Sequence, residues 1–208
     1  MNLFDFDGTL VDSNGVWVEV DNGFLARRGL VPTREYSEAV GHSIFPIAAQ
    51  FTKDYYHLDI EPQAIMDEWL GMARQAYAEH IPLKPGAREY LEACAQRGEP
   101  GVLLTACVPE LCQSALERHG LGRFFTQIIY VQQLGLEKRD PRAFVRALEL
   151  LGAAPEACTL YDDSPGACRA AQSLGIRTVG VYDAFYASYE DEMRARCERY
   201  IHSFTELL

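Results

Sequence analysis

The chain has 208 residues, of which 48% are hydrophobic and 24% are charged, a composition typical of a globular protein. Its formal net charge of −11 argues against nucleic acid as a partner, because binding to phosphates needs a basic surface. No apolar run is as long as a membrane span, and the N-terminus lacks a signal-peptide pattern. We therefore expect one large domain, or a core with an insert, with no membrane partner and a cytoplasmic location.

The first feature along the chain is a pair of carboxylates directly after the short apolar run Leu3-Phe4. Side chains at positions i and i+2 of a strand point to the same side, so Asp5 and Asp7 can converge beyond its end. Two carboxylates this close are costly unless a cation lies between them or one is protonated. A calcium loop is excluded, since its sixth position must be Gly and its twelfth Glu, and these are Leu10 and Val16 here.

Residues 14 to about 83 are predicted to be helical throughout. Apolar residues recur at helical spacing, and Gly29 is placed to end the first helix. Thr33 and Ser43 are predicted to be the N-caps of two further helices, and Pro62 suits the first turn of a fourth. Because no strand alternates with these helices, we interpret them as a separate helical insert.

From Pro85 onward, predicted helices alternate with strands. The predicted strands are 102–104, 128–131, 159–161, 178–182 and, less regularly, 198–201. This alternation predicts a parallel sheet covered by helices on both faces, in which ligands bind beyond the carboxyl ends of the strands. Asp5, Thr105 and the pair Asp162-Asp163 all stand at such ends, which predicts a functional site there.

These residues carry a family resemblance. The sequence DFDGTLVDS at residues 5–13 closely resembles the opening motif of the haloacid-dehalogenase superfamily of phosphoryl-transfer enzymes. The family pattern continues with a Ser or Thr after the second core strand, a Lys in a loop before a helix, and an acidic pair after a later strand. Thr105, Lys138 and Asp162-Asp163 match these motifs in order.

The resemblance implies an α/β fold with a Rossmann-like parallel-sheet core and an inserted α-helical cap. The core would comprise residues 1–13 and 84–208, and the cap residues 14–83. An insert at this place is similar to the cap of the small-molecule phosphatases and of the β-phosphoglucomutase-like branch. Hinges between core and cap are expected near 13–15 and 83–86.

By resemblance, Asp5 is the nucleophile that forms an aspartyl-phosphate, and Asp7 is the general acid and base. Mg²⁺ would be held by the Asp5 carboxylate, the Asp7 backbone carbonyl, Asp162 and Asp163.

The substrate's phosphoryl oxygens would be bound by Lys138 and by the Thr105 hydroxyl, with help from the backbone N–H near Ala106. Arg139 is an alternative to Lys138, and Thr105 could instead cap the helix that follows it. In the insert, His42 is expected to contact substrate, although a surface histidine is an equal alternative.

Asp7 favours phosphate-ester chemistry, because halide-displacing members of the superfamily lack a carboxylate at that position. We therefore expect a Mg²⁺-dependent phosphatase for a small phosphorylated metabolite, acting as a monomer or weak homodimer. A sugar phosphomutase is the alternative that uses the same intermediate. A non-catalytic binding module is less favoured, because Asp5, Asp7 and Lys138 are all present.

Overall fold

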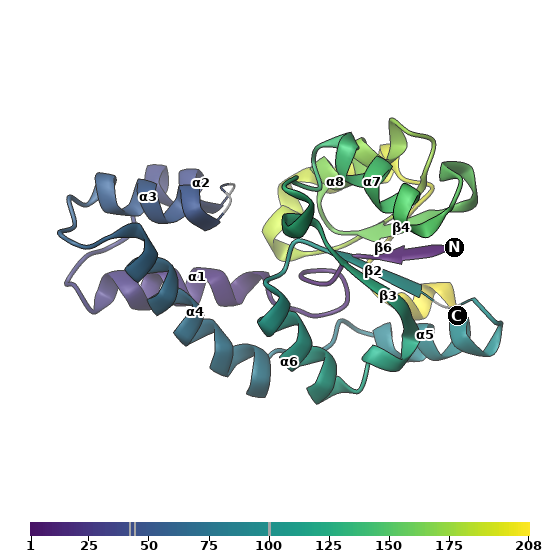
Figure 1. Cartoon of the computed structure of the whole chain (residues 1–208), viewed down its shortest axis with the longest axis horizontal. Coiled ribbons are helices and arrows are strands. Elements are labelled where there is room, and N and C mark those ends of the chain that lie inside the picture. Colours follow the sequence, from purple (N-terminus) through teal and green to yellow (C-terminus); the bar gives the residue numbers. More distant parts are fainter. Residues whose placement is uncertain (42, 44, 100) are drawn as a thin grey trace. The chain divides into compact units, whose positions relative to one another are not determined.

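The computed structural model describes residues 1–41, 43, 45–99 and 101–208. The chain divides into two compact units, one of residues 1–14 and 81–208 and the other of residues 15–80. All strands that the structure describes belong to the first unit, and the described elements of the second unit are helices. Figure 1 labels these elements along the chain.

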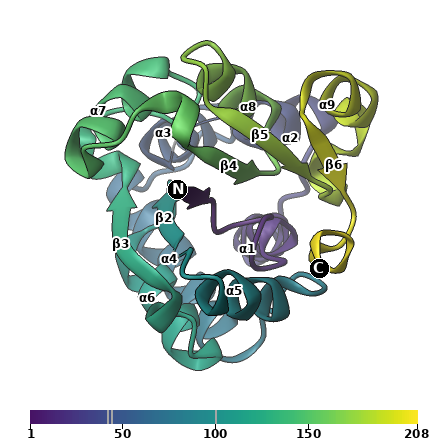
Figure 2. The ribbon, with the colours of Figure 1, turned by 90° about the vertical axis from the view of Figure 1, so that its right-hand side faces the viewer.

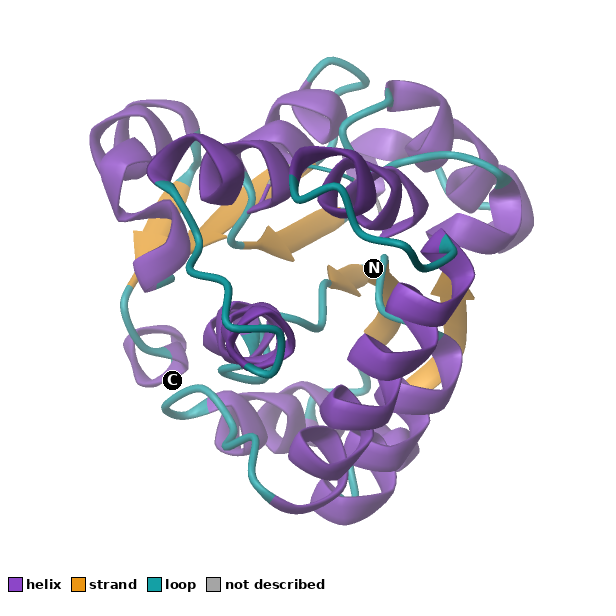
Figure 3. Ribbon diagram, turned by 90° about the vertical axis from the view of Figure 1, so that its left-hand side faces the viewer, coloured by secondary structure: helices purple, strands orange, loops and turns teal. Residues whose placement is uncertain are grey.

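The first unit is built on a six-stranded parallel sheet with the order β3-β2-β1-β4-β5-β6. Its strands form a single layer, drawn in orange in Figure 3. They are β1 (Asn2–Phe4), β2 (Gly101–Thr105), β3 (Phe125–Tyr130), β4 (Thr159–Asp162), β5 (Arg177–Val181) and β6 (Arg199–Ile201). The parallel sheet predicted from the alternation of strands and helices is therefore confirmed.

Helices cover both faces of this sheet, with α7 and α8 on one face and α5 and α6 on the other (Figure 2). The helices of this unit are α5 (Ala87–Gln96), α6 (Pro109–His119), α7 (Pro141–Leu151), α8 (Pro165–Gln172) and α9 (Glu190–Arg196). Short 3₁₀ turns are η1 (Gly122–Phe124), η2 (Val131–Leu134), η3 (Pro155–Ala157), η4 (Ala184–Tyr189) and η5 (Phe204–Leu207).

The central strand β1 is buried on both faces. Leu3 packs in the core cluster that contains residues of α7 and α8. Phe4 points the other way, stacking on Tyr161 with ring centroids 4.6 Å apart and meeting Tyr90 of α5 edge-on. The hydroxyl groups of Tyr90 and Tyr161 are 2.6 Å apart. This packing fixes the end of β1, from which Asp5 emerges, although the strand is only three residues long.

The second unit contains α2 (Arg34–Gly41), α3 (Phe45–Tyr55), α4 (Pro62–Glu79) and most of α1 (Asn14–Ala26). Thr33 caps α2 as predicted, since its hydroxyl oxygen accepts the N–H of Tyr36 at 3.1 Å. The prediction of Ser43 as an N-cap is wrong. Helix α3 begins at Phe45, and the Ser43 hydroxyl donates instead to the carbonyl of Ala39.

Aromatic rings form much of the core of this unit, including Phe24, Phe45 and Trp69. Tyr36 is fully buried, and its hydroxyl donates to the Asp21 carboxylate at 2.7 Å. No helix in either unit, as far as the structure describes them, is both long and apolar enough to cross a membrane.

Candidate active site

The predicted site begins where β1 ends. The Asp5 N–H donates to the Tyr161 carbonyl at 2.9 Å, which extends the pairing of β1 with β4 by one residue. The chain then turns sharply at Gly8, whose φ of +76° is a conformation that favours glycine. The N–H groups of Leu10 and Val11 donate to the carbonyl of Phe6 within this turn. Asp5 is thereby held at the carboxyl edge of the sheet, with only 6% of its surface exposed.

Lys138 lies between two carboxylates of this edge. Its Nζ is 2.5 Å from Asp5 Oδ1 and 2.5 Å from Asp162 Oδ2. Burial alone would lower the pKa of Lys138, but the charges of Asp162 and Asp5 outweigh it and raise that pKa, so the ammonium stays protonated. Arg139, the alternative considered from the sequence, is exposed and pairs with Glu137.

The acidic pair lies at the carboxyl end of β4, with Asp162 as the last residue of the strand. Asp162 Oδ1 accepts the N–H of Ser164 at 2.8 Å. Asp163 Oδ1 lies 3.3 Å from the Thr9 hydroxyl, and Asp163 Oδ2 accepts from the Asn14 side-chain amide at 2.9 Å. Burial raises the pKa of Asp162 to about 6, with Lys138 opposing the shift and Asp5 adding to it. Burial, followed by the charges of Asp5 and Asp162, raises the pKa of Asp163 as well.

The donor set suits a hard divalent cation. Asp5, Asp162 and Asp163 each offer a carboxylate oxygen within 4.8 Å of the other two. Asp162 Oδ2 is buried, and among the described residues it has no partner besides the Lys138 ammonium. Three buried carboxylates facing one lysine leave negative charge uncompensated, and oxygen ligands of this kind are those that Mg²⁺ prefers.

Asp7 is held by a neighbour in the same turn. The Ser13 hydroxyl, which is fully buried, donates to Asp7 Oδ1 at 2.6 Å. The side chain of Asp7 does not belong to the carboxylate cluster described above, and the expected metal contact of its backbone carbonyl stays a prediction.

Thr105 ends β2 and is fully buried. Its hydroxyl oxygen accepts the N–H of Cys107 at 2.9 Å. This contact resembles helix capping, which was the alternative role considered for Thr105 from the sequence. The hydroxyl proton can still be donated to a phosphoryl oxygen. Ala106 follows at an exposed position, and His42 lies outside the described residues. The substrate contacts of these three residues stay predictions.

Sequence reasoning gave no role in the site to Thr9, Ser13 or Asn14, and placed the last two only within the hinge expected near 13–15. Thr9 and Ser13 lie inside the DFDGTLVDS motif, so their place in it was a signal that they could contact the site. Asn14 lies one position beyond the motif, and nothing in the sequence pointed to a contact between it and the acidic pair.

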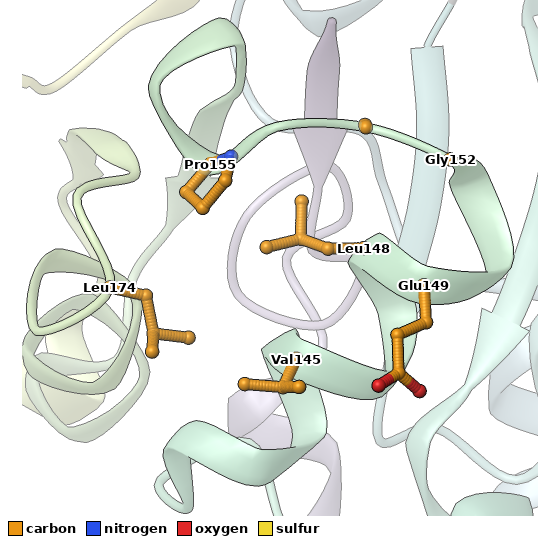
Figure 4. Close-up of a pocket in the computed structure, with 7 residues that line it drawn as sticks. Val145, Leu148, Glu149, Gly152, Pro155 and Leu174 are labelled. Atoms are coloured by element: carbon orange, nitrogen blue, oxygen red, sulfur yellow. The ribbon is translucent and has the colours of Figure 1, made fainter.

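A surface groove of about 430 Å³ lies elsewhere on this unit (Figure 4). It is lined by Val145, Leu148, Glu149, Gly152, Ala153, Pro155 and Leu174. Pro155 begins the turn η3, which leads into β4, so the groove lies toward the amino end of that strand. Ligands of such sheets bind at the opposite, carboxyl ends, and none of the predicted site residues lines the groove.

Comparison with known proteins agrees with this geometry. The chain is 28% identical over 187 residues to the phosphoglycolate phosphatase of Pseudomonas putida, covering 86% of this chain and 68% of the relative. It is 37% identical over 101 residues to the phosphoserine phosphatase of Thermus thermophilus, covering 48% of this chain and 41% of the relative. The solved structure of CbbY from Rhodobacter sphaeroides in complex with phosphate has the same fold, with a TM-score of 0.82, 22% identity, and coverage of 99% of this chain and 95% of that one.

The sequence pattern of the haloacid dehalogenase-like hydrolase family matches residues 2–181. The match spans β1, the acidic pair at the end of β4, and β5. The chain therefore belongs to the haloacid dehalogenase-like hydrolase family.

Proposed function

We propose that this hydrolase is a Mg²⁺-dependent phosphatase that cleaves a small phosphate monoester through an aspartyl-phosphate on Asp5. The observation that carries the proposal is the environment of Asp5. Its carboxylate is buried at the end of β1, with Lys138 on one oxygen and the Thr9 hydroxyl 3.2 Å from the other. The names of the two curated relatives support a phosphatase, and their substrates are small phosphorylated acids.

In the first step, a carboxylate oxygen of Asp5 attacks phosphorus, and the bond from phosphorus to the ester oxygen breaks. Asp7 gives its proton to that oxygen, so the product leaves as an alcohol. In the second step, Asp7 takes a proton from a water molecule, whose oxygen attacks phosphorus, and the bond from phosphorus to the Asp5 oxygen breaks, which releases inorganic phosphate. Asp5 and Asp7 thereby return to their starting states.

The other residues supply positive charge and orientation. Lys138 lies 2.5 Å from the nucleophilic carboxylate, so it can contact an oxygen of a phosphoryl group attached there. Thr105 would donate its hydroxyl proton to another phosphoryl oxygen. A Mg²⁺ ion held by Asp5, Asp162, Asp163 and the Asp7 carbonyl would neutralise charge on the phosphoryl oxygens and on the carboxylates themselves.

We further propose that the helical insert, expected at residues 14–83, serves as a cap that excludes water during the reaction. Its compactness supports this role, because residues 15–80 form a unit of their own in the chain between the first and second motifs. His42 would be one of its substrate contacts.

The proposal is tested by measuring Mg²⁺-dependent release of inorganic phosphate from a panel of monoesters. The panel contains phosphoglycolate, phosphoserine and sugar phosphates, including β-glucose 1-phosphate, and Asp5→Asn is the blank. We expect phosphate release by the wild type and none by Asp5→Asn, whose circular dichroism should be unchanged. Isomerised sugar phosphate with little free phosphate would favour the phosphomutase instead, and neither product across the panel would contradict the proposed activity.

A further inference from the structure

Asn14 lies where the chain leaves the first unit. It is the first residue of α1, it is half-buried, and the next residue already belongs to the second unit. Its side-chain amide donates to Asp163 Oδ2 at 2.9 Å. A residue at the junction of the two units is thus hydrogen-bonded to a carboxylate of the acidic cluster.

The turn at Gly8 provides the space for this hydrogen bond. A Cβ atom at position 8 would lie 2.2 Å from Asp163 Oδ2 and 2.3 Å from Asn14 Nδ2. Real Cβ atoms do not approach other atoms so closely, so the Asn14–Asp163 pair occupies the place of a side chain that Gly8 lacks. The hydrogen bond between Asn14 and Asp163 therefore requires a glycine at position 8.

The two side-chain donors to Asp163 are not equivalent. Thr9 lies 3.3 Å from Asp163 Oδ1, but the same hydroxyl is 3.2 Å from Asp5 Oδ2, so one proton serves two carboxylates. The amide of Asn14 is directed at Asp163 at the shorter distance of 2.9 Å. The orientation of the Asp163 carboxylate therefore depends more on Asn14 than on Thr9.

We infer that Asn14 is a positioning residue, which holds the Asp163 carboxylate in the orientation that binds the divalent cation. This inference rests on the role of Asp163 as a metal ligand in the proposed function. Residues that orient metal ligands without touching the metal commonly contribute about 10- to 100-fold to metal affinity. Removing the Asn14 amide should weaken Mg²⁺ binding by a factor in this range.

A purely structural role for Asn14 predicts a different result. If the hydrogen bond only secured the start of α1, its removal would lower the stability of the protein and leave the affinity for Mg²⁺ unchanged. Affinity and stability must therefore be measured separately on the same variants.

The test is isothermal titration calorimetry of Mg²⁺ into the metal-free full chain, without substrate. Asn14→Leu removes the amide at nearly constant volume, and Asn14→Ala removes the whole group. The matched control is Asn22→Ala, because Asn22 is an exposed asparagine of the same helix. Urea unfolding in the presence of a chelator gives the stability of each variant without metal.

We expect the dissociation constant of Mg²⁺ to rise about 10- to 100-fold in both Asn14 variants and to stay at the wild-type value in Asn22→Ala. An affinity within about two-fold of wild type in both Asn14 variants would overturn the inference. If the wild type binds Mg²⁺ in that experiment, the proposed metal site still stands. Failure of the wild type to bind Mg²⁺ would overturn the metal site and the role of Asn14 together.

Discussion

Replacing Lys138 by methionine isolates the electrostatics of the site. Methionine keeps most of the side-chain volume but removes the charge that lies 2.5 Å from both Asp5 and Asp162. Lys138 is 9% exposed and Asp162 is fully buried, so solvent screens the remaining carboxylates poorly. Removing one partner of a buried ion pair costs about 3–5 kcal/mol, and Lys138 serves two partners. We expect the metal-free variant to lose about 4 kcal/mol of unfolding free energy at pH 7.

This loss should depend on pH in a defined direction. Burial raises the pKa of Asp162 to about 6 even with Lys138 opposing the shift, so the pKa rises further without the lysine. A carboxyl group whose pKa is higher in the folded state destabilises the fold when it is charged. The loss should be greatest above this raised pKa and should shrink as the pH falls to about 6, the pKa of Asp162 in the wild type, because below it the carboxyl is protonated in both folded proteins. Saturating Mg²⁺ at pH 7 should also reduce this loss of unfolding free energy.

The assay is urea unfolding of wild type and variant in a chelator at pH 7 and pH 5, followed by far-ultraviolet circular dichroism. Tryptophan fluorescence is unsuitable, because Trp17 and Trp69 both belong to the unit of residues 15–80, whereas β1 and β4 belong to the other unit. With a slope of about 2 kcal/mol per molar urea, the midpoint at pH 7 should fall by about 2 M.

Lys53→Met is the control for that experiment, since Lys53 pairs with the exposed Glu61 and should contribute at most about 1 kcal/mol. A loss below about 1 kcal/mol for Lys138→Met at pH 7, or an equal loss at both pH values, would refute the reasoning. Either result would mean that the buried carboxylates are not charged together in the folded protein.

Three further substitutions test other parts of the site and its support. Asp163→Asn removes a charged ligand, so the Mg²⁺ concentration for half-maximal phosphate release should rise at least about ten-fold; an unchanged requirement would mean that the ligands are misassigned. Gly8→Ala places a Cβ 2.2 Å from Asp163 Oδ2 at a φ of +76°, so urea unfolding should show a loss of at least about 1–2 kcal/mol; wild-type stability would contradict the described turn. Tyr161→Phe leaves the Tyr90 hydroxyl without its 2.6 Å partner and should lower the unfolding free energy by about 1–3 kcal/mol with little change in turnover.

The gathering of the charged residues could be predicted from the sequence because it depends on topology. Asp5 and Asp162 each follow an apolar run, and the ends of neighbouring parallel strands meet at one edge of the sheet. The register confirms this, since Phe4 pairs with Tyr161 and the next residues are Asp5 and Asp162. The alternation of strands and helices was therefore sufficient to predict that these carboxylates, far apart in the sequence, lie at the same edge of the sheet.

Contacts that depend on the local path of the chain could not be predicted in this way. The hydrogen bonds of Thr9, Ser13 and Asn14 require the turn at Gly8, whose dihedral angles a pattern does not specify. Strand β3 was predicted at 128–131, but it spans Phe125–Tyr130. It lies at the edge of the sheet, where Thr126 and Gln127 are exposed, so its first half has no apolar pattern to detect.

The central position of β1 has a consequence for biosynthesis. The strand lies between β2 and β4, so its pairing is complete only when residues up to Asp162 have been made. At about 5–20 residues per second, β4 leaves the ribosome roughly 8–30 s after β1. During this interval Leu3 and Phe4, both fully buried in the finished sheet, lack one of their neighbouring strands. The helices of residues 15–80, whose contacts are local, can form meanwhile. The segment that carries Asp5 is thus synthesised well before β4, its surroundings are completed late, and a newly made chain remains inactive until β4 has docked.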